Sequence, residues 1–200
     1  MSVWRRWVGF VTLGELTGFL VPALVGSVST DLPAAAQLLA FCTAGTAEGA
    51  MLGFAQAHVL RSVLRGFRYR AWVLATAGGA ACAWLLGMLP STTYGWWSTW
   101  PTPVVLVLAV PLGVLLLLSI GAAQALVLPG SARDGRRWVG VNALGWAAAL
   151  TVFTLVATPW WQPGQEPWQV IGIGLVAGAA MAATMAATTG VEVLHLSRRP

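Results

Sequence analysis

Two glutamates, Glu15 and Glu48, interrupt long apolar stretches of this chain and are the residues best suited to carry chemistry. Glu15 follows Arg6 by nine residues, and Glu48 precedes Arg61 by thirteen. At 1.5 Å per helical residue, the acids lie ~13 Å and ~20 Å from those arginines. An acidic side chain near the centre of a bilayer costs about 2.5–3.5 kcal/mol, so we expect both acids to face protein or water and to be able to hold a proton.

The helical positions of the two acids predict that neither points at lipid. Glu15 shares a helix face with Gly18, and Glu48 lies beside Gly45 and Gly49. A pair of acids in adjacent helices predicts a protonatable site. The sequence does not identify catalytic residues, and Glu15 and Glu48 are the candidates for that role. The alternative is structural, because a buried neutral glutamic acid can simply donate a hydrogen bond to a nearby carbonyl.

Further polar and aromatic residues within the apolar stretches are candidates for binding a ligand. They are Gln56, Gln124, Asn142, Trp84 and Trp146. The two glutamines and the asparagine lie at a similar depth and are expected to form a polar ring, for which interhelical hydrogen bonding is the simpler explanation. The sequence contains no phosphate-binding loop, His-Glu-x-x-His or Cys-x-x-Cys motif, and we expect no cofactor and no metal site.

The composition indicates that a bilayer surrounds these residues. The chain is 58% apolar and 8% charged, which cannot cover a soluble globule with polar surface. All eleven basic residues are arginines in four clusters, and each interval between clusters suits two crossings of roughly 20 residues. We therefore expect six crossings, over about 6–28, 35–61, 70–89, 103–128, 137–158 and 168–195.

The arginine clusters also predict orientation and partners. Six crossings place every cluster on one side of the membrane, and the positive-inside tendency makes that side cytoplasmic, together with both termini. Anionic lipid headgroups are the expected counterions, and no nucleic acid is expected because the arginines form no continuous basic face. Tryptophans beside the arginines (Trp4, Trp7, Trp72 and Trp138) and in the opposite loops are expected to form two interfacial belts.

A pattern of arginine followed closely by Trp-Val recurs at 5–8, 70–73 and 136–139, and seven positions after each tryptophan stands a glycine. In the returning helices, Gly53, Gln56, Val59 and Leu60 align with Gly121, Gln124, Val127 and Leu128, and more weakly with Ala187, Gly190, Val193 and Leu194. The repeat predicts a single integral membrane domain over 1–200, all-α, built from three helical hairpins at about 5–69, 70–135 and 136–200. Successive hairpins would enter the membrane in the same orientation, so we expect a six-helix bundle about a pseudo-threefold axis along the membrane normal.

The hairpin starts and the stretch 53–61 carry a resemblance to a known group of proteins. With its Gly-x-x-Gln-x-x-Val-Leu-Arg pattern, the chain resembles small uncharacterised multi-pass membrane proteins of bacteria that repeat this hairpin. The likeness covers most of the chain, although the third copy lacks the glutamine. It implies a topology, and it transfers no activity and no catalytic residues. The location that we expect is a bacterial inner membrane.

Three functions are compatible with this sequence. The leading hypothesis is a protein that binds or moves a small apolar molecule or protons through a central cleft, with Glu15 and Glu48 as protonatable groups. The second is an intramembrane enzyme that uses Glu acid catalysis on a lipid or isoprenoid substrate, which requires a dry aromatic pocket. The third is a non-catalytic subunit or scaffold, whose glycine stripes would dock against another copy or a partner membrane protein and which predicts no cavity.

Overall fold

The computed structural model describes residues 2–29 and 31–198, and these residues form helices and connecting loops without a β-strand. The helices are α1 (Val3–Val28), α2 (Ala34–Leu60), α3 (Tyr69–Thr92), α4 (Tyr94–Trp97), α5 (Thr102–Ala125), α6 (Ala132–Ala157) and α7 (Pro167–Ser197). All except α4 are long and apolar enough to cross a membrane. The six expected crossings are thereby confirmed as apolar helices of spanning length, with ends within a few residues of those expected.

Local sequence signals explain where the helices begin. The Ser2 hydroxyl accepts a hydrogen bond from the backbone N–H of Arg5 at the start of α1. Ser131 and Asp134 form a reciprocal capping box at the start of α6, which satisfies two backbone donors. Prolines precede α2 and α5, where the absence of a backbone N–H costs nothing.

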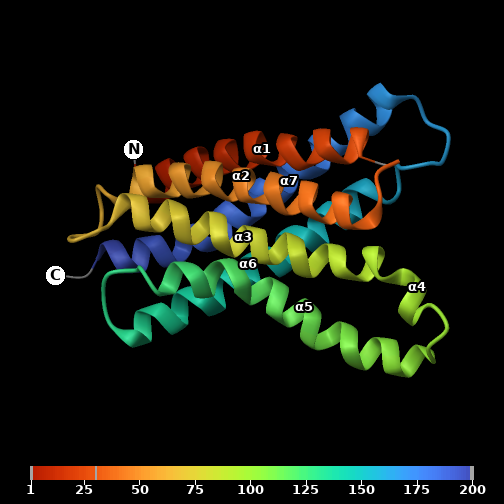
Figure 1. The fold of residues 1–200 in the computed structure, drawn as a ribbon. Helices are drawn as coiled ribbons and strands as arrows, with labels where there is room; N and C mark the ends of the chain where they lie inside the picture. Colours follow the sequence, from red (N-terminus) through yellow and green to blue (C-terminus); the bar gives the residue numbers. More distant parts are fainter. Residues whose placement is uncertain (1, 30, 199–200) are drawn as a thin grey trace.

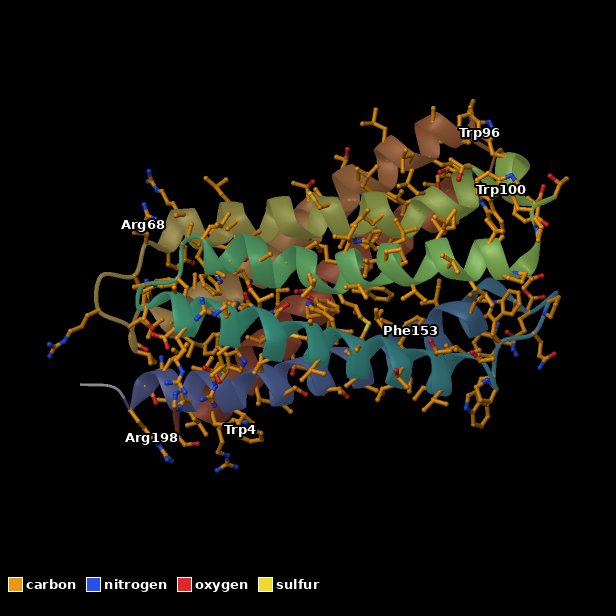
Figure 2. The ribbon with its side chains drawn as sticks, turned by 90° about the horizontal axis from the view of Figure 1, so that it is seen from below. Trp4, Arg68, Trp96, Trp100, Phe153 and Arg198 are labelled. Carbon is orange, nitrogen blue, oxygen red and sulfur yellow. The ribbon has the colours of Figure 1, made fainter. Side chains whose placement is uncertain are left out.

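The six long helices form a closed ring. Each packs against its neighbour along the chain, with α3 meeting α5, and α7 returns to pack on α1. In Figure 1, α1 begins and α7 ends at one end of the bundle, where the α2–α3 and α5–α6 connections also lie. Arg68 and Arg198 mark this arginine end in Figure 2, and Trp96 and Trp100 mark the opposite tryptophan end. Toward the tryptophan end, α3 and α5 diverge (Figure 1).

Glycines bring the helix backbones together inside this ring. A Cβ at Gly14 of α1 would clash with the Ala55 Cβ of α2, and one at Gly18 would lie 3.1 Å from the Glu48 backbone oxygen. On α2, a Cβ at Gly49 would clash with the Ala80 Cβ of α3, and one at Gly53 would lie 3.0 Å from Thr76. Close backbone approach is the usual basis of helix association in membranes, so the glycine stripes of α1 and α2 serve packing within the chain.

Three tryptophans lie in the interior instead of at the membrane interface. Trp7, Trp72 and Trp138 are each 0% exposed, so the expectation that they belong to an interfacial belt was wrong. Trp138 meets the other two edge to face, with ring centroids 6.1 Å from Trp7 and 5.4 Å from Trp72. Around the tryptophan end, by contrast, Trp96 and Trp160 are largely exposed, as a belt requires.

Candidate functional site

A cavity of about 290 Å³ lies inside the helical ring, and all six long helices contribute to its wall. Only two of its lining residues are ionisable, Glu15 from α1 and Glu48 from α2. The rest of the wall is apolar or aromatic, with Leu52, Leu116 and Met181 among the aliphatic side chains. The cavity is partly enclosed, and its size is near the lower end of small-molecule pockets, which run from about 300 to 1,000 Å³.

The two glutamates meet in this cavity. Glu15 is 0% exposed and Glu48 is 7% exposed, which confirms the prediction that neither faces lipid. Both line the same cavity, and the Glu48 backbone and Cγ pack at the position of Gly18, one turn along α1 from Glu15. Carboxylates only accept hydrogen bonds, so one acid can donate to the other only if a proton is bound between them. The arrangement is therefore a pair of acids suited to share a proton.

Close backbone packing brings the two acids together. Gly18 lies one turn beyond Glu15 on α1, and a Cβ at Gly18 would be 3.1 Å from the Glu48 backbone oxygen and 3.3 Å from its Cγ. Because glycine has no side chain, α2 can approach α1 at the level of Glu48. The small residue thus sets the distance between the acids.

The two acids differ in their hydrogen-bond partners. The Trp84 Nε1–H donates to Oε2 of Glu48 at 2.6 Å. Both carboxyl oxygens of Glu15 are buried and have no donor among the described residues. Hydrogen bonds from neutral donors stabilise an anionic carboxylate, so Glu48 is the better placed of the two to carry the negative charge of a singly protonated pair.

Aromatic side chains form the wall near the acids. Trp84 stacks on Phe41 with a centroid distance of 5.3 Å and an interplanar angle of 13°. Trp146 of α6 also lines the cavity, and its buried Nε1–H has no acceptor among the described residues. Phe19 and Phe153 meet edge to face at 5.8 Å and complete this side of the wall. Both tryptophans singled out from the sequence therefore lie at the same cavity as the two acids.

A second buried assembly, which we call the Trp–Gln layer, closes the bundle between the cavity and the arginine end. It comprises Trp7, Trp72, Trp138, Gln56, Gln124, Thr76, Asn142 and Thr189. On α3 the layer uses Trp72 and Thr76, whereas the cavity begins at Ala80, so the layer lies on the arginine side of the cavity. Its tryptophan rings are inaccessible to solvent.

Hydrogen bonds connect the Trp–Gln layer across helices. Trp72 donates to Gln56 at 3.0 Å, and Trp138 donates to Gln124 at 2.9 Å. Gln124 in turn donates to Gln56 at 2.7 Å, and the Asn142 amide donates to Gln124 at 3.4 Å. The predicted polar ring of Gln56, Gln124 and Asn142 thus exists as a hydrogen-bonded group, and none of the three lines the cavity.

Sequence patterns did not predict that tryptophans and threonines belong to this layer. The Trp7 Nε1–H donates to the Thr189 hydroxyl at 3.0 Å, and the Thr76 hydroxyl accepts from Gln124 at 2.9 Å. The recurrence of tryptophan at the same place in each proposed repeat was the available signal for an interior role. The sequence indicated an interior position for Thr189 only weakly, because Thr189 directly precedes Gly190, the residue that aligns with Gln56 in the proposed repeat.

A separate ionic contact joins α6 and α7 near the arginine end. The Arg137 Nε donates to Glu192 Oε2 at 2.6 Å, and the Arg137 guanidinium also reaches His195 Nε2 at 3.3 Å. Glu192 is 1% exposed. Within residues 2–29 and 31–198, no group of three His, Cys, Asp or Glu side chains could hold a metal ion. This contact therefore links two helices.

Comparisons with known proteins return no similar chain. No protein-family model matches the sequence, and neither the curated proteins nor the solved structures include a significant match.

Proposed function

We propose that this chain is a six-helix inner-membrane protein that binds or moves a small, largely apolar molecule, or protons, through the central cavity. Glu15 and Glu48 are its protonatable groups. The observation that carries this proposal is that these two buried acids line one cavity whose other walls are apolar or aromatic. Burying two acids together is costly in a membrane, and a site that handles protons or polar groups of a ligand explains why they are there.

The proposal includes three hairpin repeats about a pseudo-threefold axis. The contacts of the Trp–Gln layer support it, because the tryptophan of each hairpin donates to the second helix of the hairpin before it. Trp72 of α3 donates to α2, and Trp138 of α6 donates to α5. Trp7 of α1 donates to α7 of the third hairpin, which completes the cycle. The glycines seven positions after these tryptophans support it as well. Each faces the other helix of its own hairpin, where Gly14 meets α2, Gly79 meets α5 and Gly145 meets α7.

The proposed location is a bacterial inner membrane with both termini in the cytoplasm. The arginine clusters support this orientation, since α1 begins and α7 ends at the end of the bundle where Arg68 and Arg198 lie (Figures 1 and 2). Anionic headgroups would surround these arginines. Any homo-oligomer or partner protein would need a surface other than the glycine faces of α1 and α2, which are used within the chain. The half of α7 toward the tryptophan end is one such surface, because no atom of the described residues lies within 4 Å of a Cβ added at Gly172 or Gly174.

The aromatic wall favours a second candidate function, an intramembrane enzyme acting on a lipid or isoprenoid. In that case one glutamic acid would donate a proton to an alkene or epoxide, and the faces of Trp84 and Trp146 would stabilise the resulting cation. The enzyme requires a closed, dry pocket, whereas the cavity is only partly enclosed. The binding or transport proposal therefore fits the geometry better.

Infrared difference spectroscopy tests whether the acids act as a pair. Wild type, Glu15→Gln and Glu48→Gln would be purified, and the carboxyl C=O bands followed across pH. We expect one acid to titrate in the accessible range and the substitution of its partner to move that titration, because both acids line the same apolar cavity and lie on closely packed helices.

Asp31→Asn is the matched control for this experiment. Asp31 is an exposed acid in the loop between α1 and α2, so its loss should leave the pair's titration unchanged. If neither Glu15 nor Glu48 titrates, or if each is indifferent to the other's substitution, the proposed function fails.

A further inference from the structure

The cavity contains more hydrogen-bond acceptors than donors. Glu15 and Glu48 bring four carboxyl oxygens, and Trp84 provides a donor to one of them. Both oxygens of Glu15 are fully buried, and apart from a proton shared with Glu48 neither has a donor among the described residues. Buried polar groups are normally satisfied, so unpartnered oxygens at the wall of a cavity indicate that a bound molecule completes the site.

The described part of the chain places no positively charged side chain in the cavity wall beside these acids. None of the described residues that line the cavity is Arg, Lys or His. Arg68 and Arg198 lie at the arginine end (Figure 2), and the Trp–Gln layer separates that end from the cavity. A negative charge in apolar surroundings is expensive unless it is paired, so a cationic ligand would stabilise the acid pair whenever the pair holds only one proton.

The aromatic wall provides the other half of a cation site. Trp84, Trp146, Phe19 and Phe153 all line the same cavity as the acids. The faces of aromatic rings attract cations, tryptophan most strongly, and this attraction grows when water is excluded. The aliphatic remainder of the wall suits an apolar body attached to the charged group.

We infer that the cavity binds a lipophilic organic monocation, an amine or quaternary ammonium group on an apolar body, between the Glu15–Glu48 pair and the rings of Trp84 and Trp146. A single positive charge matches the pair, because two acids that share one proton carry one negative charge. This inference rests on the proposed function and names the chemical class of its ligand. It requires cations to be preferred over neutral molecules of the same shape.

Two ligands of nearly identical shape test this preference. Benzyltrimethylammonium carries one positive charge, and neopentylbenzene is its neutral counterpart with carbon in place of nitrogen. Binding of each, in radiolabelled form, would be measured by equilibrium dialysis to the full chain in nanodiscs, with protein-free nanodiscs as the background. We expect the cation to bind at least tenfold more tightly than the neutral ligand.

Substitutions then locate the cation. The double variant Glu15→Gln/Glu48→Gln should weaken cation binding about tenfold or more and change neutral-ligand binding less than twofold, because it removes the charge of the pair and keeps its shape. Of the single variants, Glu48→Gln should weaken cation binding more than Glu15→Gln, because Trp84 stabilises the charge on Glu48. Asp31→Asn should change neither. Circular dichroism and gel filtration would show that each variant is folded, and if the double variant is unstable the difference between the two single variants decides the outcome.

The outcomes separate this inference from the proposed function. Equal binding of the two ligands, unaffected by the glutamine variants, would overturn the cation preference and leave a cavity for apolar molecules. No binding of either ligand, combined with coupled titration of the acids, would overturn the inference and leave a proton site. No binding and no coupled titration would overturn both.

Discussion

Replacing Gln124 with methionine should destabilise the helical ring by an amount that the structure allows us to estimate. Gln124 is 0% exposed. Its amide donates to Gln56 at 2.7 Å and to Thr76 at 2.9 Å, and its carbonyl accepts from Trp138 at 2.9 Å and from Asn142 at 3.4 Å. Methionine has nearly the same length and volume, so the substitution removes these bonds without opening a large cavity.

The expected loss is about 2–4 kcal/mol in the free energy of unfolding. Interhelical hydrogen bonds in a membrane protein contribute about 0.6 kcal/mol each on average, so four of them give ~2.4 kcal/mol. The Trp138 Nε1–H would also remain buried without an acceptor, and leaving a buried donor unsatisfied costs about 1–3 kcal/mol. The loss of the Trp138 hydrogen bond is counted in both figures, so the expected loss of about 2–4 kcal/mol is smaller than their sum.

Equilibrium unfolding in mixed micelles of a mild detergent and sodium dodecyl sulfate, followed by circular dichroism, would measure this loss. Gln162→Met is the matched control, since Gln162 is exposed in the loop between α6 and α7. Combining Gln124→Met with Trp138→Phe forms a double-mutant cycle, and we expect a coupling energy of about 0.5–1.7 kcal/mol. A loss below about 0.5 kcal/mol, or one equal to that of Gln162→Met, would refute a structural role for the Trp–Gln layer.

Two further substitutions test helix packing elsewhere in the ring. Gly49→Ala should lower the free energy of unfolding by about 1–3 kcal/mol, because the added Cβ would lie 2.5 Å from the Ala80 Cβ and 2.8 Å from the Thr76 carbonyl oxygen. Gly78→Ala is the control in the same unfolding assay. It should be nearly neutral, because no atom lies within 4 Å of a Cβ at Gly78. Glu192→Gln should lower the free energy of unfolding by about 1–3 kcal/mol, between the values for exposed and buried ion pairs, since Glu192 is buried but the Arg137 side chain is 48% exposed. Equal thermal unfolding temperatures for this variant and wild type would contradict a stabilising contact between α6 and α7.

Much of the helical architecture could be predicted from the sequence because the signals are local. Runs of about 20 apolar residues, interrupted by proline and glycine clusters and bordered by arginines, indicate helices of spanning length. The inward orientation of Glu15 and Glu48 was also predictable, since their helical positions place them beside glycines and away from lipid. Both predictions depend only on spacing along one helix.

The position of Trp7, Trp72 and Trp138 could not be inferred from their immediate neighbours. Tryptophan next to arginine is typical of a membrane interface, and each of these residues fits that description when its helix is considered alone. The ring turns all three inward, where Trp138 contacts the other two and each indole N–H finds an acceptor on another helix. Partners distant in the sequence therefore outweighed the local pattern.

The sequence by itself determined which residues are costly to bury in a membrane, and the tertiary structure decided which of them meet. Periodicity sets the face of a helix on which Glu15 or Glu48 lies, but their distance depends on how closely α1 and α2 approach, and Gly18 allows that approach. The same packing brings Trp84 and Trp146 to the acids and keeps Gln56, Gln124 and Asn142 away from them. Contacts between helices form only when the ring closes, which is why the cavity and its unpartnered oxygens are properties of the fold.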